Sequence, residues 1–297
     1  MFFFFGIIIL GIFDYSKYPR KIFCGKTEFF MRLLNEGIIY SISAEGWQLY
    51  LIYGLFLLMG IAAAYLLGSV NSAIIISRVL YRDDIRRHGS GNAGMTNMLR
   101  TYGKGAAGLT LLGDMLKTAI AILIMALFFG FHYDAGISIE GNCYIAGLFA
   151  ILGHVFPVYY GFKGGKGVLC TATMALVLTP FVFVLLLALF IAIVAVSKYV
   201  SLGSVSVAVL YPIAVTGYVK LRFGMPTPGL ITLCAILIAI FIVWCHRHNL
   251  QRISDRTENK ISFKKKPTVQ KADNTNGEDI SGASTVNTDS EENEDNE

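Results

Sequence analysis

Apolar residues run along this chain in long stretches that are separated by short polar loops. Stretches of roughly 20 apolar residues are typical of helices that cross a bilayer, because the backbone must satisfy its own hydrogen bonds in hydrocarbon. We identify seven candidate spans, at Leu49–Tyr81, Ala106–Gly130, Asn142–Tyr160, Gly167–Leu178, Pro180–Ser197, Gly203–Val219 and Gly229–Cys245. The pattern therefore predicts an all-α polytopic membrane protein, a bundle of seven transmembrane helices.

Some of these helices are expected to be short or broken. The first span contains the polar segment Gly68-Ser69-Val70-Asn71-Ser72, where the helix is expected to break. The fourth and fifth spans are short and are separated only by Thr179-Pro180. Six spans, with these two merged into one, are the alternative.

The polar and apolar pattern divides the chain into three regions. Residues 1–45 form an N-terminal extension whose apolar run, Phe2–Phe13, is too short to span and follows no basic region, unlike a signal peptide. Either Met31 is the true start or this run lies in the membrane interface. Residues 46–262 form the seven-span membrane domain. Residues 263–297 are rich in Asn, Asp, Glu and Ser and are expected to be a disordered, acidic cytoplasmic tail.

Composition supports the membrane prediction and charge gives the chain a direction. Hydrophobic residues make up 55% of the sequence and charged residues 15%, with a mean hydropathy of +0.59. Lys and Arg in the loops of a membrane protein are retained on the cytoplasmic side. They crowd the loops at 82–105, 161–166 and 198–202 and the stretch after Cys245, whereas the opposite loops hold only Lys220 and Arg222. The basic face is therefore expected to be cytoplasmic.

The first basic loop has the composition of an anion site. Glycines let backbone N–H groups approach an anion, hydroxyls and amides donate hydrogen bonds, and arginine offers a charged fork. The candidate phosphate ligands here are Gly89, Ser90, Gly91, Asn92, Thr96, Asn97 and Arg100. Gly89–Gly94 also matches G-x-G-x-x-G, but a dinucleotide site needs a βαβ unit, and the neighbours here are membrane helices.

The second and third clusters lie at other ends of spans on the same face. Lys166 is framed by Gly164, Gly165 and Gly167 where a helix begins, and N–H groups at a helix start attract anions. This segment is no Walker loop, because Gly167 stands where a Ser or Thr would hold magnesium. After the last span, His246 and Asn249 are three residues apart and share a face if the helix continues. We read His154 as a structural residue and expect the intramembrane Asp114 and Lys117 to pair, with each other or with loop groups.

These motifs resemble the acyl-phosphate-dependent glycerol-3-phosphate acyltransferases of bacterial membranes, the PlsY type. The resemblance covers roughly residues 64–261. It rests on G-S-G-N-x-G-x-T-N-x-x-R at Gly89–Arg100, on G-H-x-x-P and F-K-G-G-K-G within Gly153–Gly167, on S-L-G-S at Ser201–Ser204, and on H-x-x-N-x-x-R ahead of Glu258. The chain departs from the family pattern at Asn71, where many members have proline, at Met95 in place of alanine, and at Arg256 in place of the usual glycine.

The resemblance implies an activity and a set of site residues. The implied reaction moves a fatty acyl group from acyl phosphate to the 1-hydroxyl of glycerol 3-phosphate at the cytoplasmic face of the bacterial inner membrane, giving lysophosphatidic acid and phosphate. The implied catalytic residues are Ser90, Arg100, Lys166, His246 and Asn249, and Ser204 and Glu258 join the glycine-loop residues above as substrate ligands.

Other partners and activities are weighed against this expectation. We expect no cofactor, no metal site and no nucleic acid, since the histidines and cysteines lack ligand spacing, and the oligomeric state is left open. An H-x-x-x-x-D motif, typical of acyl-CoA-dependent glycerolipid acyltransferases, is absent from the sequence. The alternative function is transport of an anionic phosphorylated metabolite, which would need polar groups through the membrane depth.

Overall fold

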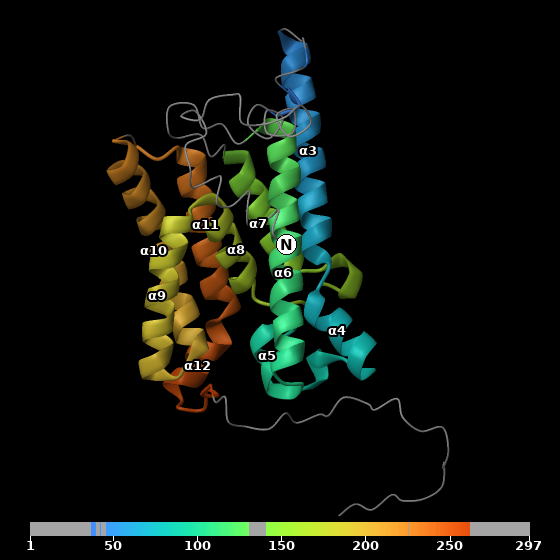
Figure 1. The fold of residues 1–297 in the computed structure, drawn as a ribbon, viewed down its shortest axis with the longest axis vertical. Helices are drawn as coiled ribbons and strands as arrows, with labels where there is room; N and C mark the ends of the chain where they lie inside the picture. Colours follow the sequence, from blue (N-terminus) through green and yellow to red (C-terminus); the bar gives the residue numbers. More distant parts are fainter. Residues whose placement is uncertain (1–36, 40–41, 43–45, 131–140, 225, 262–297) are drawn as a thin grey trace, which may run out of the picture.

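The computed structural model describes residues 37–39, 42, 46–130, 141–224 and 226–261, and that part of the chain is a bundle of helices without strands (Figure 1). The helices and 3-10 turns are α3 (Trp47–Ser69), α4 (Ser72–Tyr81), η4 (Ile85–Arg87), α5 (Met95–Thr101), α6 (Lys104–Phe129), α7 (Gly141–Val155), η6 (Val158–Tyr160), α8 (Val168–Leu178), α9 (Pro180–Ser197), α10 (Val200–Phe223), α11 (Gly229–Cys245) and α12 (Arg247–Ser254). Nearly all of the N-terminal extension and the whole acidic tail lie outside the described residues.

The all-helical membrane architecture is confirmed, but the count of seven spans is not. By length and composition, five stretches of the described residues can cross a membrane: Trp47–Tyr81, Lys104–Phe129, Gly141–Tyr160, Pro180–Ser197 and Val200–Arg222. Helices α11 and α12 meet at a bend of 52° and together make a sixth candidate. Helix α8 has 11 residues, which is about 16 Å of helix and well short of a hydrocarbon core.

The first span breaks where the sequence predicts. Helix α3 ends at Ser69 and α4 begins at Ser72, with Asn71 as the N-cap of α4. The side-chain oxygen of Asn71 accepts a hydrogen bond from Ile74 N at 3.1 Å, which satisfies one of the unpaired donors at the helix start. The break therefore has a local cause in this asparagine.

Helices α8 and α9 run in opposite directions, so the start of α8 and the end of α9 lie on the same side of the bundle. Lys166, just before α8, bonds to Asn249, and Asn249 bonds to Glu258. Ser201, just after α9, also bonds to Glu258. One merged span would put Lys166 and Ser201 on opposite sides of the membrane, so the six-span alternative built on that merger does not fit.

Glycines let helices α3 and α7 approach closely. A Cβ at Gly68 would overlap the backbone carbonyl of Ala150, and one at Gly153 would overlap the carbonyl of Tyr65. Close packing through small residues holds helices together in a bilayer, where apolar side chains gain little from leaving lipid. This contact fixes the end of α7, and with it the start of the second basic loop, against the break after α3.

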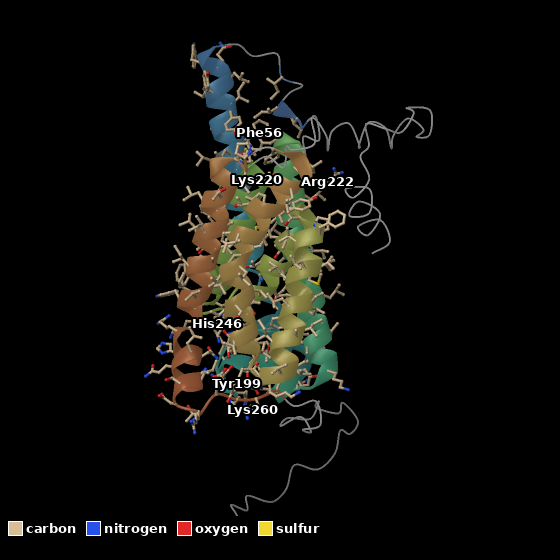
Figure 2. All side chains as sticks on the ribbon, turned by 90° about the vertical axis from the view of Figure 1, so that its left-hand side faces the viewer. Phe56, Tyr199, Lys220, Arg222, His246 and Lys260 are labelled. Atoms are coloured by element: carbon tan, nitrogen blue, oxygen red, sulfur yellow. The ribbon has the colours of Figure 1, made fainter. Side chains whose placement is uncertain are left out.

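The flanks of the bundle are apolar and its two ends differ in charge. On α9, Val184, Leu185 and Val196 are 63%, 63% and 87% exposed, as expected of side chains that face lipid. Figure 2 shows Lys220 and Arg222 toward one end of the bundle, and Tyr199, His246 and Lys260 toward the other. The predicted site residues gather at this second end.

Candidate active site

Asn97 organises the first basic loop. Its side-chain oxygen accepts from Ser90 N at 3.2 Å, and its Nδ2 donates to the carbonyls of Ile85, His88 and Asn92 at 3.3, 2.9 and 3.1 Å. Asn97 is 2% exposed, so these bonds form away from water, where an unmade bond is costly. Its polar groups are thus directed at the loop backbone, and the loop is held as one unit.

Two glycines of this loop adopt backbone conformations that favour glycine. Gly89 and Gly91 have φ of +56° and +69°, which side chains disfavour, and a Cβ at Gly89 would overlap the Asn97 amide oxygen. Ser90 between them is exposed, and Asn92 and Thr96 are partly buried. The loop therefore offers the Ser90 hydroxyl at its surface while Asn97 holds it from below.

Helix α5 carries Arg100 from this loop to the C-terminal segment. Its guanidinium donates from Nη2 to the carbonyl of Asn259 at 3.1 Å. Burial lowers the pKa of Arg100, an effect that Glu258 partly opposes and that Arg252 reinforces. Two regions about 160 residues apart in sequence therefore meet at this end of the bundle.

The second basic loop folds back onto the end of α7. The N–H groups of Gly164 and Gly165 donate to the carbonyls of Val155 and His154, both at 3.1 Å, so they pair the open end of that helix. Gly167 has φ of +78° and starts α8. The glycines thus hold the loop close to α7, and Lys166 extends from it toward α12.

Lys166, Asn249 and Glu258 form a chain of hydrogen bonds. Lys166 Nζ donates to Asn249 Oδ1, and Asn249 Nδ2 donates to Glu258 Oε1 at 2.7 Å. Glu258 also accepts from Ser201 Oγ at 2.9 Å and, through Oε2, from Arg252 Nε at 2.8 Å. This carboxylate therefore joins α10, α12 and the glycine loop.

Positive charge exceeds negative charge in this cluster. Burial lowers the pKa of Lys166 to about 8, and Arg252 and Arg100 add to the shift while Glu258 opposes it. For Glu258, burial is the largest influence and raises its pKa, but hydrogen bonds from Asn249, Arg252 and Ser201 outweigh it and the net shift is downward. Three basic side chains thus share one ionised carboxylate, which leaves room for the charge of a phosphate.

His246 lies at the bend between α11 and α12. It is 3% exposed and its Nδ1 lies 2.8 Å from the carbonyl of Ile242, so Nδ1 carries the proton and Nε2 is the free acceptor. Burial, with help from Lys166, lowers its pKa to about 4. His246 and Asn249 are both buried while Arg247 and His248 are exposed, so the expected shared inward face is present.

The serine that bonds to Glu258 is not Ser204, the serine that the sequence analysis named as a ligand. Ser204 is 3% exposed and donates to Val200 O at 2.9 Å within its own helix, whereas Ser201 reaches Glu258. Arg252, a further hydrogen-bond partner of Glu258 beside Asn249 and Ser201, was also outside the expected set. Both residues lie in the S-L-G-S and H-x-x-N-x-x-R motifs, so the signal was present in the sequence.

Comparison with known proteins gives one consistent result. Residues 58–256 match the model of a family described as glycerol-3-phosphate acyltransferase. The chain is 41% identical over 200 residues to the glycerol-3-phosphate acyltransferase of Syntrophomonas wolfei, covering 67% of this chain and 94% of the relative. It is 38% identical over 200 residues to that of Geobacillus kaustophilus, covering 67% and 93%.

Solved structures agree with the sequence relatives. The fold is similar to the crystal structure of PlsY (YgiH), an integral membrane glycerol 3-phosphate acyltransferase, in its glycerol 3-phosphate form. The TM-score is 0.59 at 31% identity, over 69% of this chain and 96% of that one. A lysophosphatidic acid form of the same enzyme matches with a TM-score of 0.58 at 29% identity, over 70% and 96%. These relatives are acyltransferases, and the transport alternative gains no support from them.

Proposed function

We propose a reaction from the premise that this chain belongs to the glycerol-3-phosphate acyltransferase family and transfers a fatty acyl group to glycerol 3-phosphate in phospholipid synthesis. The proposed donor is an acyl phosphate. The 1-hydroxyl oxygen of glycerol 3-phosphate attacks the acyl carbon, the bond from that carbon to the phosphate oxygen breaks, and lysophosphatidic acid and orthophosphate leave. An acyl phosphate is already activated, so binding and orientation can supply much of the rate.

The excess of positive charge around Glu258 carries this proposal. Besides burial, Arg100 and Arg252 lower the pKa of Lys166, and Arg252 also lowers that of Arg100. Glu258 is the carboxylate that opposes these shifts and lies near all three cations. Both proposed substrates bring a phosphate, and a partly buried group of cations binds phosphate more strongly than it would in open water. An acyl-CoA donor would place a much larger head group at the same loops.

The proposed roles follow from the charge or hydrogen-bonding group that each side chain brings to the site. Arg100 and Lys166 bind substrate phosphates, and the exposed Ser90 donates a hydrogen bond with the help of the glycines beside it. Asn249 holds Lys166, and His246 with Asn249 orients the reacting groups. Asn92, Thr96 and Ser204 complete the proposed ligand set.

A substrate phosphate is the proposed acceptor of the hydroxyl proton. His246 Nε2 is free to accept, but the low pKa of this imidazole makes it a weak base. A phosphate monoester loses its second proton near pH 6, so its dianion is a stronger base than the His246 imidazole. The proton therefore leaves with, or next to, the phosphate that the cations bind.

The site is proposed to face the cytoplasm of a bacterial inner membrane. Basic residues crowd the end of the bundle that holds Tyr199, His246 and Lys260, and Lys220 and Arg222 lie toward the other end (Figure 2). Retention of basic loops in the cytoplasm gives this orientation. The proposed catalytic domain is residues 46–262.

The deciding experiment supplies the purified protein with glycerol 3-phosphate and either palmitoyl phosphate or palmitoyl-CoA. Orthophosphate and the acylated product should appear together with palmitoyl phosphate and not with palmitoyl-CoA. Turnover with the CoA ester alone would overturn the proposed donor. Lys166→Ala and Arg100→Ala should each lose activity, while Lys163→Ala, a change at an exposed lysine of the same loop, serves as the matched control.

A further inference from the structure

Three ionisable side chains lie inside the bundle, away from the cluster around Glu258. Asp114 and Lys117 on α6 and His154 on α7 are 1%, 5% and 3% exposed. Lys117 Nζ lies 2.9 Å from Asp114 Oδ1 and 2.9 Å from His154 Nδ1. Buried ionic groups are costly in a membrane and a buried pair is weak support for stability, so their presence calls for a role.

Lys117 connects this network to the break in the first span. Its ammonium also donates to the carbonyl of Val70 at 2.8 Å, at the end of α3. The next residue, Asn71, is the N-cap of α4, and its Nδ2 lies 3.4 Å from the carbonyl of Ala93 in the first basic loop. Lys117 therefore holds the break between α3 and α4, and Asn71 at this break contacts the first basic loop.

His154 connects the same network to the second loop. An ammonium is a donor only, so His154 Nδ1 accepts from Lys117 and Nε2 carries the ring proton. Nε2 lies against Gly165, where an added Cβ would overlap it and would lie 2.8 Å from the carbonyl of Ala93. The backbone carbonyl of His154 also accepts from Gly165 N at 3.1 Å. His154 thus contacts the residue immediately before Lys166 with both its ring and its backbone.

We infer that Asp114, Lys117 and His154 are positioning residues for acyl transfer, which fix the backbone at Gly165 and thereby aim Lys166 at a substrate phosphate. Asp114 holds the Lys117 ammonium, Lys117 holds the imidazole, and the imidazole holds the glycine loop. The same ammonium steadies the break after α3, so both phosphate loops are set by one buried cation. This inference rests on the role of Lys166 in the proposed function.

The test is a double-mutant cycle between His154 and Lys166. His154→Asn keeps an acceptor near Lys117 but withdraws the ring from Gly165, and we expect at least a tenfold loss in kcat/KM, with most of it in the KM for one phosphate substrate. In a Lys166→Met background the same change should cost less than twofold, because a lysine that is absent cannot be misplaced. If the fold-losses of the two single variants multiply in the double variant, the inference is overturned.

A second measurement tests the contact itself. Gly165→Ala should reduce activity strongly in the wild type, where the new methyl overlaps the imidazole, and less in the His154→Asn background, where the overlap with the ring is gone and the close approach to the Ala93 carbonyl remains. Equal losses in the two backgrounds would contradict the inference. Thermal denaturation of each variant in the same detergent separates misplacement from misfolding, because positioning predicts kinetic losses larger than any change in Tm accounts for.

The inference and the proposed function can fail separately. Unchanged kinetics in Lys166→Met would refute the proposed role of Lys166 and remove the basis of the inference as well. A large loss in Lys166→Met together with full multiplication by His154→Asn would refute only the positioning network. Binding of glycerol 3-phosphate, measured by calorimetry without a donor, gives the same cycle independently of which acyl donor the enzyme uses.

Discussion

The charge of Lys166 is expected to set the upper pH limit of activity. Its pKa is lowered from the ordinary value of 10.5 to about 8, chiefly because the ammonium is buried. Below pH 7 nearly every molecule carries this charge, at pH 8 about half do, and at pH 9 about a tenth do. The substrate phosphates are already dianions over this range, so the enzyme group alone should change.

The expected result is a fall in kcat/KM that follows this titration. Between pH 8 and 9 the value should drop about fivefold, and above pH 9 about tenfold per pH unit, which is roughly 1.4 kcal/mol of lost binding per unit. The dependence of kcat/KM reports the free enzyme, so the pKa raised by bound phosphate does not hide it. Orthophosphate release from acyl phosphate, followed at limiting glycerol 3-phosphate and then at limiting donor, shows which phosphate Lys166 binds.

Lys166→Arg supplies the control that matters most. A guanidinium stays charged throughout the range, so any activity this variant retains should be flat from pH 7 to 10. Lys163→Arg, at an exposed position, should keep the wild-type profile. A wild-type profile that is flat through pH 9.5, or a Lys166→Arg profile that falls with the same midpoint, would refute the assignment.

Three further changes test the surrounding structure. Glu258→Gln should lower stability by about 1–3 kcal/mol at neutral pH, because charge-assisted hydrogen bonds are lost. Since the pKa of Glu258 is lowered, the difference in Tm from wild type should shrink as pH falls below the ordinary carboxyl range near 4.5. A difference in Tm that stays constant with pH would contradict the reasoning. Arg256→Gly should raise stability by about 1 kcal/mol by relieving φ of +59°, with activity kept, whereas Asp255→Gly at φ of −80° should lower it; denaturation midpoints that rank the other way would refute this. Asn97→Ala should cost about 2–4 kcal/mol and raise the KM for a phosphate substrate, and an unchanged Tm would show that its hydrogen bonds do not hold the loop.

The sequence predicted the helices and the convergence of the loops because both depend on local patterns. Apolar length gives the helices, and the basic loops share a face because successive spans alternate in direction. Asn71 breaks the first span because its side chain caps the next helix, which is again a local effect. The inward face of His246 and Asn249 follows from their spacing of three residues on a helix.

The remaining features depend on distances that no local pattern encodes. Ser201 and Ser204 share a face of α10, and which of them bonds to Glu258 depends on where the C-terminal segment lies. The expected pairing of Lys117 with Asp114 is present, because the two are three residues apart on one helix, but its bonds to Val70 O and His154 could not be predicted, because both reach it from other helices. Arg256 departs from the glycine of the resembled pattern, yet it adopts the positive φ that a glycine would take, and Glu258 keeps its bonds.

The shortness of α8 sets how deep in the bundle Lys166 lies. Helix α8 has 11 residues and its returning partner α9 has 18, and seven residues of helix rise about 10 Å. Gly167 therefore lies about that much closer, along the helix axis, to the turn at Thr179 than the end of α9 does. With the acyl-phosphate donor proposed above, an anchored chain would bring the donor phosphate to Lys166 from the bilayer side, and glycerol 3-phosphate would enter from the end of the bundle. For that proposed donor, a mixed anhydride, such a depth would limit contact with free water and so slow its hydrolysis before the acceptor arrives.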